Sequence, residues 1–99
     1  MDLWTWGGRF FGYREDDALF THTGKHVGRF HGSEVYGSDG AYLGEVMDDR
    51  LIRNQAKVGK RQLGFMPEMS RVGMVPYVDY VATVMYVGHE DFPGPETFA

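Results

Sequence analysis

The stretch VYGSDGAYLGEV, residues 35–46, has the pattern of a short β-hairpin: an apolar pair, a polar turn that contains glycine, and a second apolar segment. The stretch LFTHTGKHVGRF, residues 19–30, has the same pattern 16 residues earlier. Glycine in such a turn can adopt a positive φ, which residues with a β-carbon rarely do. The two stretches therefore predict a hairpin unit that occurs more than once in the chain.

A third copy begins near the N-terminus, and the three copies align at a spacing of 16 residues. The matched columns are Trp4, Phe20 and Tyr36; Gly8, Gly24 and Gly40; Phe11, Val27 and Leu43; and Gly12, Gly28 and Gly44. We expect repeat units at about residues 3–17, 18–33 and 34–49. One hairpin with strands of about five residues is not stable alone, so several units must share a core.

A fourth unit begins at residue 50, but Ala56 stands where the turn glycine is expected. The stretch KRQLGFMPEMSRVGMVP, residues 60–76, breaks the periodicity, and we interpret it as an inserted loop. The valines and tyrosines of residues 77–87 favour a strand that closes the fourth unit. The predicted fold is an all-β, barrel-like or flower-like assembly of about four short antiparallel hairpins in one domain, residues 1–99.

Length and composition limit the classes of function. The 99 residues suffice for one domain, and 42% of them are hydrophobic, which is enough for a core. The chain contains no cysteine, so disulfides, thiolate catalysis and thiolate metal sites are excluded, and a reducing compartment fits. The first residues, MDLWTWGGRFF, show neither a basic leader nor a long apolar run. We therefore expect a cytoplasmic protein without a membrane span.

The repeated pattern in residues 18–52, ALFTHTGKHVGRFHGSEVYGSDGAYLGEVMDDRLI, resembles the four-fold beta flower proteins. These are small bacterial domains in which a glycine-bearing hairpin recurs around a pseudo-four-fold axis. The single unit VYGSDGAYLGEV also resembles the opening hairpin of a PRC-barrel domain, a fold that does not need the triple repeat. The beta flower family has no established activity, so the resemblance implies a fold and no catalytic residues.

The inserted loop is the first candidate surface. It carries too many apolar side chains for a purely solvated loop, and methionine is adaptable packing material at binding surfaces. Two interpretations stay open: the loop plugs one end of the barrel, or it contacts a protein partner, such as a second copy with which inserts are exchanged. The candidate partner-binding residues are Leu63, Phe65, Met66, Met69 and Met74.

A basic segment is the second candidate surface. Residues 50–71 contain six lysines and arginines against Glu68 alone, inside a chain of net charge -4. Its candidate anion-binding residues are Arg53, Lys57, Lys60 and Arg61. They could contact a nucleic acid, but the acidic chain favours a loop that neutralises acidic turns of the same molecule or of a neighbouring subunit.

The histidines are the third candidate group. His22, His26 and His31, with Asp17 or Asp39, could converge on a small cation. The matching positions of the next unit are Ser38, Tyr42 and Met47, so the repeat does not reproduce such a site, and exposed turn residues are the favoured interpretation. We predict no metal, no cofactor and no catalytic residue.

Together these patterns predict a non-catalytic binding or self-assembly module whose partner is another copy or a different protein. The alternative is a small-ligand or metal-binding domain, enzymatic or not, that uses the histidine region or the point where the hairpins converge.

Overall fold

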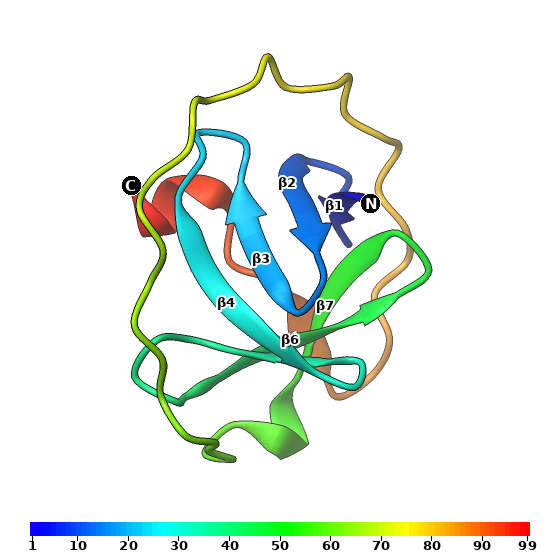
Figure 1. The fold of residues 1–99 in the computed structure, drawn as a ribbon. Helices are drawn as coiled ribbons and strands as arrows, with labels where there is room; N and C mark the ends of the chain where they lie inside the picture. Colours follow the sequence, from blue (N-terminus) through cyan, green and yellow to red (C-terminus); the bar gives the residue numbers. More distant parts are fainter.

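The computed structural model describes all 99 residues and contains eight β-strands and no α-helix. Neighbouring strands are antiparallel from β1 to β8, and a parallel pairing of β1 with β7 closes the first seven into a barrel (Figure 1). The prediction of an all-β barrel is thus confirmed. The strands are β1 (Asp2–Thr5), β2 (Phe10–Glu15), β3 (Ala18–Thr21), β4 (His26–His31), β5 (Glu34–Tyr36), β6 (Tyr42–Met47), β7 (Arg50–Asn54) and β8 (His89–Asp91).

Two short 3₁₀ helices complete the fold: η1 (Gln55–Lys57) follows β7, and η2 (Pro95–Phe98) follows β8. The side chain of Asn54 caps η1 by accepting a hydrogen bond from the backbone N–H of Ala56. Neither helix has the length or the apolar character that a membrane-spanning helix requires.

The barrel core is formed by residues that recur at a fixed spacing. Leu3, Leu19, Val35 and Leu51 lie 16 residues apart, one on each odd-numbered strand of the barrel, and all four are fully buried. Phe92, directly after β8, packs edge-on against Phe11 with ring centroids 5.3 Å apart. The core therefore draws an equivalent side chain from each odd-numbered strand, and the C-terminal segment completes it.

The glycines inside the strands allow the backbones to come close together. In three strand pairs an apolar residue of one strand faces a glycine of the other: Leu3 faces Gly12, Leu19 faces Gly28, and Val35 faces Gly44. Directly after each of these positions the pairing register of the two strands shifts. A β-carbon on Gly12 would collide with the carbonyl of Phe20 in the neighbouring strand. Such collisions explain why small residues occupy these sites.

The prediction of a strand over residues 77–87 is wrong. That segment is extended but belongs to no strand, and β8 takes its place beside β7, with Ile52 opposite Asp91 and Asn54 opposite His89. The reason is that the backbone of residues 77–87 donates hydrogen bonds to turns of the barrel and not to a strand ladder.

We call residues 61–87 the strap. In Figure 1 the strap runs outside the barrel, from yellow-green to orange, and passes around it before returning to β8. The strap connects η1 to β8, so both of its ends are fixed to β7: η1 follows β7 directly, and β8 pairs with it.

Candidate docking surface

The strap contacts three tight turns of the barrel in the same way. Gly8, Gly24 and Gly40 occupy these turns with φ of 97°, 92° and 88°. The carbonyl of each glycine accepts a hydrogen bond from a strap N–H, and the donors are nine residues apart. The bonds are Gln62 to Gly40 (2.9 Å), Arg71 to Gly24 (2.8 Å) and Tyr80 to Gly8 (2.7 Å).

A second hydrogen bond to each turn follows three residues later along the strap. These bonds join the N–H of Phe65 to the carbonyl of Ser38 (3.0 Å), Met74 to His22 (2.8 Å) and Thr83 to Trp6 (3.3 Å). Each acceptor lies two residues before the turn glycine. In an extended segment at the surface, the backbone N–H groups usually donate hydrogen bonds to water. In the strap, six of them donate to carbonyls of the three turns in a repeated pattern.

A nine-residue period in the sequence matches these contacts. The three segments are QLGFMPEMS at residues 62–70, RVGMVPYVD at 71–79 and YVATVMYVG at 80–88. Gly64, Gly73 and Ala82 coincide, and a β-carbon on Gly64 would lie 2.5 Å from the carbonyl oxygen of Ser38. The interpretation of residues 60–76 as aperiodic is therefore wrong: the period there is nine and not 16.

One row of strap side chains, at every third residue, faces the barrel. Phe65 stacks on His26 with ring centroids 4.6 Å apart, and the Arg71 guanidinium lies 4.1 Å above the centre of the Phe20 ring. Tyr80 stacks on Trp4 at 4.0 Å. A repeat of three residues per turn is the period of polyproline II, a conformation that Pro67 and Pro76 favour.

The next row along the strap points away from the barrel. It contains nine apolar side chains at every third residue, and each is between 85% and 100% exposed. We call this row the apolar ridge. Its members are Leu63, Met66, Met69, Val72, Val75, Val78, Val81, Val84 and Val87.

The ridge is large for a surface left in water. An aliphatic side chain loses roughly 60–120 Å² of apolar surface on full burial, so nine of them expose on the order of 500–1,000 Å². The largest apolar patch of a typical monomer is about 300–600 Å². A standard interface buries about 800 Å² on each partner. Over its whole length the ridge therefore exposes about as much apolar surface as a standard interface buries on one partner.

The predicted partner-binding residues divide between the two rows. Leu63, Met66 and Met69 lie on the ridge, whereas Phe65 and Met74 lie on the inner row and are partly buried against the barrel. The candidate partner-binding residues chosen from the sequence include none of the six valines of the ridge. Their regular spacing of three residues was the signal that could have identified them.

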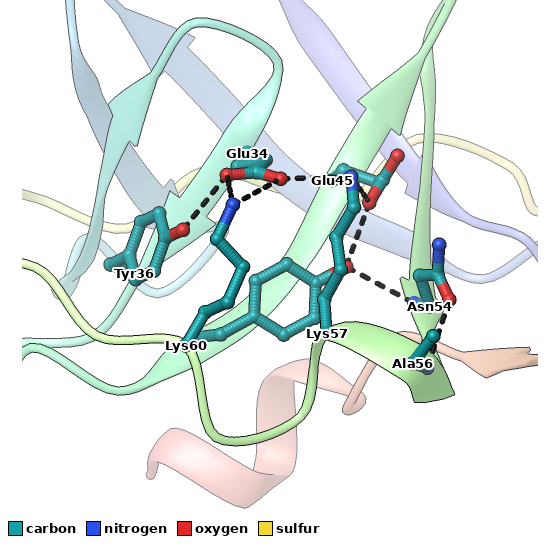
Figure 2. Close-up of polar contacts among 8 residues, drawn as sticks. Glu34, Tyr36, Glu45, Asn54, Ala56, Lys57 and Lys60 are labelled. Carbon is teal, nitrogen blue, oxygen red and sulfur yellow. Dashed lines mark hydrogen bonds and ion pairs between the residues drawn. The ribbon is translucent and has the colours of Figure 1, made fainter.

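A cluster of charged and phenolic groups holds the chain just before the strap (Figure 2). Lys57 Nζ lies 2.8 Å from Oε2 of Glu34 and 2.9 Å from Oε1 of Glu45. Lys60 Nζ reaches the same Glu34 at 3.1 Å, and the hydroxyl of Tyr36 donates to it at 2.8 Å. Three donors on one carboxylate fix η1 and residue 60 to β5 and β6.

These contacts shift the protonation of the cluster. The hydrogen bond from Lys57, followed by that from Tyr36, lowers the pKa of Glu34 to about 2. The two glutamates raise the pKa of Lys57. Burial raises the pKa of Tyr42, which donates to Glu45, to about 12. At neutral pH Glu34 is therefore a carboxylate, Lys57 an ammonium group and Tyr42 a neutral phenol.

All four predicted anion-binding residues contact groups of the same chain. Lys57 and Lys60 belong to the cluster above. Arg53 Nε lies 3.6 Å from Oε1 of Glu90, and Arg61 donates to the carbonyl of Asp39 at 2.7 Å. Arg53, Lys57 and Lys60 are thus paired with glutamates of the same molecule, which lie in strands and not in turns, whereas Arg61 contacts a backbone carbonyl.

The interpretation of the three histidines as exposed residues is wrong for His26, which is buried between the barrel and the strap, whereas His22 is half-buried and His31 is exposed. The Nδ1 atom of His26 accepts a hydrogen bond from the backbone N–H of Glu68, so Nε2 carries the proton and donates to the carbonyl of Gly28, both at 3.0 Å. His22 lies near the ring of Phe10, and His31 lies edge-on to Tyr36. No group of three or more His, Cys, Asp or Glu side chains is placed to hold a metal ion.

A cavity of about 380 Å³ lies beside His26, beneath the strap. Its lining is mixed in character: it includes Lys25, Asp39 and Glu68 as well as Phe98. The ammonium of Lys25 donates to the carbonyl of Phe98 at 2.6 Å. The cavity could take a small polar molecule.

Comparisons of the chain with known protein families, with curated proteins and with solved structures give no match.

Proposed function

We propose that the protein is a non-catalytic binding or self-assembly module that acts through the apolar ridge. The observation that carries this proposal is the exposure of nine apolar side chains at every third residue of a strap whose other face is bound to the barrel. A strap that served only to cover the barrel would turn polar side chains to water, because exposed apolar rows promote association.

We propose four hairpin units, the fourth formed by β7 and β8 with the strap between them, in a chain related to the four-fold beta flower proteins. The 16-residue spacing of Leu3, Leu19, Val35 and Leu51 in the core supports it, as does the positive φ of Gly8, Gly24 and Gly40. A cytoplasmic location belongs to the same proposal, and the lack of cysteine supports it.

The polar groups support a structural role and not a chemical one. Glu34 and Glu45 are bound by lysines and tyrosines of the same chain, and both ring nitrogens of His26 have partners. A general acid or base needs a proton position open to a substrate. In these groups the hydrogen-bonding positions are already occupied by partners in the same chain. Those contacts hold the strap, and the residues just before it, to the barrel.

Native mass spectrometry of the protein as purified, beside the variant Val75→Asp, tests the proposal. We expect the wild type to appear as two or more chains of 11.3 kDa without an adduct. We expect Val75→Asp to appear as a single chain, because a carboxylate in the middle of the ridge would have to be desolvated on association. A single wild-type chain that retains a small molecule or metal would contradict the proposal.

The second candidate function is a small-ligand domain, and the cavity beside His26 is the observation that favours it. Under this alternative the retained mass should disappear in Lys25→Ala, which removes the cation at the cavity wall, and should persist in Val75→Asp. The two variants therefore separate the two functions in one set of spectra.

A further inference from the structure

We infer that the partner of the apolar ridge is a second copy of this chain, packed ridge against ridge around a two-fold axis at Val75. This inference rests on the proposed function and specifies its partner.

The composition of the ridge points to a copy of itself. None of its nine side chains carries a charge or a hydrogen-bonding group, although the chain as a whole has a net charge of -4. Interfaces between different proteins are on average no more apolar than the rest of the surface, whereas homodimer interfaces are distinctly more apolar. Discrimination between different partners also relies on polar and charged elements, which the ridge lacks.

The apolar ridge is exposed at all times, and this also favours a second copy of the chain as its partner. The strap is held by two hydrogen bonds at each of three turns, so the ridge is presented whenever the protein is folded. Exposed apolar surface on this scale favours association. A second copy of the chain is the partner that is always present at the same concentration.

The spacing of the ridge allows two copies to interdigitate. Ridge side chains recur at every third residue, so the gaps in one ridge match the side chains of another in size and period.

The length of the strap determines where two copies meet. At about 3.1 Å per residue, the ridge from Leu63 to Val87 spans roughly 75 Å. The molecule is only 36 Å in its longest dimension, so the strap must bend around it, and only part of the ridge can lie against a partner. An axis at Val75, the fifth of the nine, leaves the same number of ridge side chains on either side of the contact. Val75 then faces its own copy, and Val72 faces Val78.

Disulfide cross-linking tests this arrangement, because the natural chain contains no cysteine. The variants are Val75→Cys and, as the matched control, Leu63→Cys; the two native side chains are 85% and 86% exposed. In paired copies of Val75→Cys the two introduced thiols are adjacent. In paired copies of Leu63→Cys the thiols lie far beyond the Cα separation of about 6 Å that a disulfide allows.

The readout is the rate of covalent dimer formation under mild oxidation, followed on non-reducing gels. In a preformed dimer the thiols have an effective concentration near 1 mM, so at about 10 µM protein Val75→Cys should cross-link roughly 100-fold faster than Leu63→Cys. Equal rates for the two variants, slow or fast, would overturn the inference.

Sedimentation velocity of the wild type separates this failure from failure of the proposed function. Equal cross-linking rates with an oligomeric wild type would mean that the module assembles by another contact. Equal rates with a single chain at every concentration would remove self-assembly as well.

Discussion

Tyr80 of the strap stacks on Trp4 of β1, with ring centroids 4.0 Å apart and an angle of 14° between the rings. The indole N–H of Trp4 donates to the carbonyl of Val78, two residues earlier on the strap, at 3.0 Å. Trp4 therefore contacts the strap both through its ring face and through its polar atom. Trp4 and Phe20, two members of the repeated aromatic column, thus form a platform on which the strap lies.

Replacing Tyr80 should loosen the strap and destabilise the fold. Tyr80→Ala removes the stack on Trp4 and the contact with Arg50, whose guanidinium lies 4.8 Å from the tyrosine ring centre. We expect a loss of about 1–3 kcal/mol in the free energy of unfolding, since an aromatic pair contributes beyond its buried area. Chemical denaturation measures the loss, and hydrogen exchange at the N–H of Thr83 reports the strap.

The control for Tyr80→Ala is Val81→Ala, the next residue on the ridge, which is 87% exposed. Val81→Ala should leave the stability of the single chain unchanged within about 0.5 kcal/mol. Equal losses for the two variants would show that the strap is not held through its inner row.

The turn glycines should be required for two separable reasons. Gly24 has φ of 92°, and a β-carbon there would also collide with the carbonyl of Arg71 in the strap. Gly59 has φ of 103°, but a β-carbon on it would meet no atom within 4 Å. Gly59→Ala should therefore cost only the backbone strain, about 1–2 kcal/mol. Gly24→Ala should cost about 1–3 kcal/mol more because of the collision.

Thermal or chemical unfolding of the two glycine variants checks this difference. In Gly24→Ala the N–H of Arg71 should also exchange with solvent faster, because its hydrogen bond to residue 24 is displaced. If both variants lost the same stability, the close passage of the strap would be refuted.

Acid should weaken the cluster at the start of the strap. The pKa of Glu34 falls from an ordinary 4.5 to about 2 in the folded protein, mainly through the hydrogen bond from Lys57. Because the folded pKa is the lower one, folding favours the carboxylate. The stabilisation is complete above about pH 4.5 and is lost as the pH falls toward 2.

The variant Glu34→Gln measures this contribution. Its deficit in unfolding free energy relative to the wild type should be nearly constant from pH 7 to about pH 5 and should shrink between about pH 4.5 and 2. In a Lys57→Met background the same substitution should show a smaller deficit, because the main partner of Glu34 is gone. A deficit that does not change with pH would exclude the ionic role of Glu34.

Much of the barrel could be predicted from sequence because its signals are local. A turn glycine such as Gly40 and the apolar residues on either side of it lie within a dozen positions of one another. The closure could not be predicted, because the pairing of Trp4 with Arg50 joins distant segments and leaves no local pattern. The place of β8 was missed for the same reason.

The conformation of the strap was predicted wrongly because its residue types fit both a β-strand and a polyproline II segment. Valine and tyrosine are typical of strands, and this led to the prediction of a strand over residues 77–87. Their period is three and not two, which is the period of polyproline II and not of a pleated strand. The three-residue period also places Phe65 on the inner row and its neighbour Met66 on the ridge. Both residues are apolar, so composition alone does not show which of them faces the barrel.

Oxidation of the ridge methionines should weaken self-association. Met66 and Met69 are 89% and 91% exposed in the single chain, and conversion to the sulfoxide places a polar oxygen on an otherwise apolar row. After brief treatment with hydrogen peroxide, the wild type should sediment as a smaller species. The double variant Met66→Leu, Met69→Leu should keep its assembly, because leucine preserves the apolar surface and cannot be oxidised in this way. Equal dissociation of wild type and variant would assign the effect to another methionine, and no dissociation of either would mean that this end of the ridge lies outside the contact.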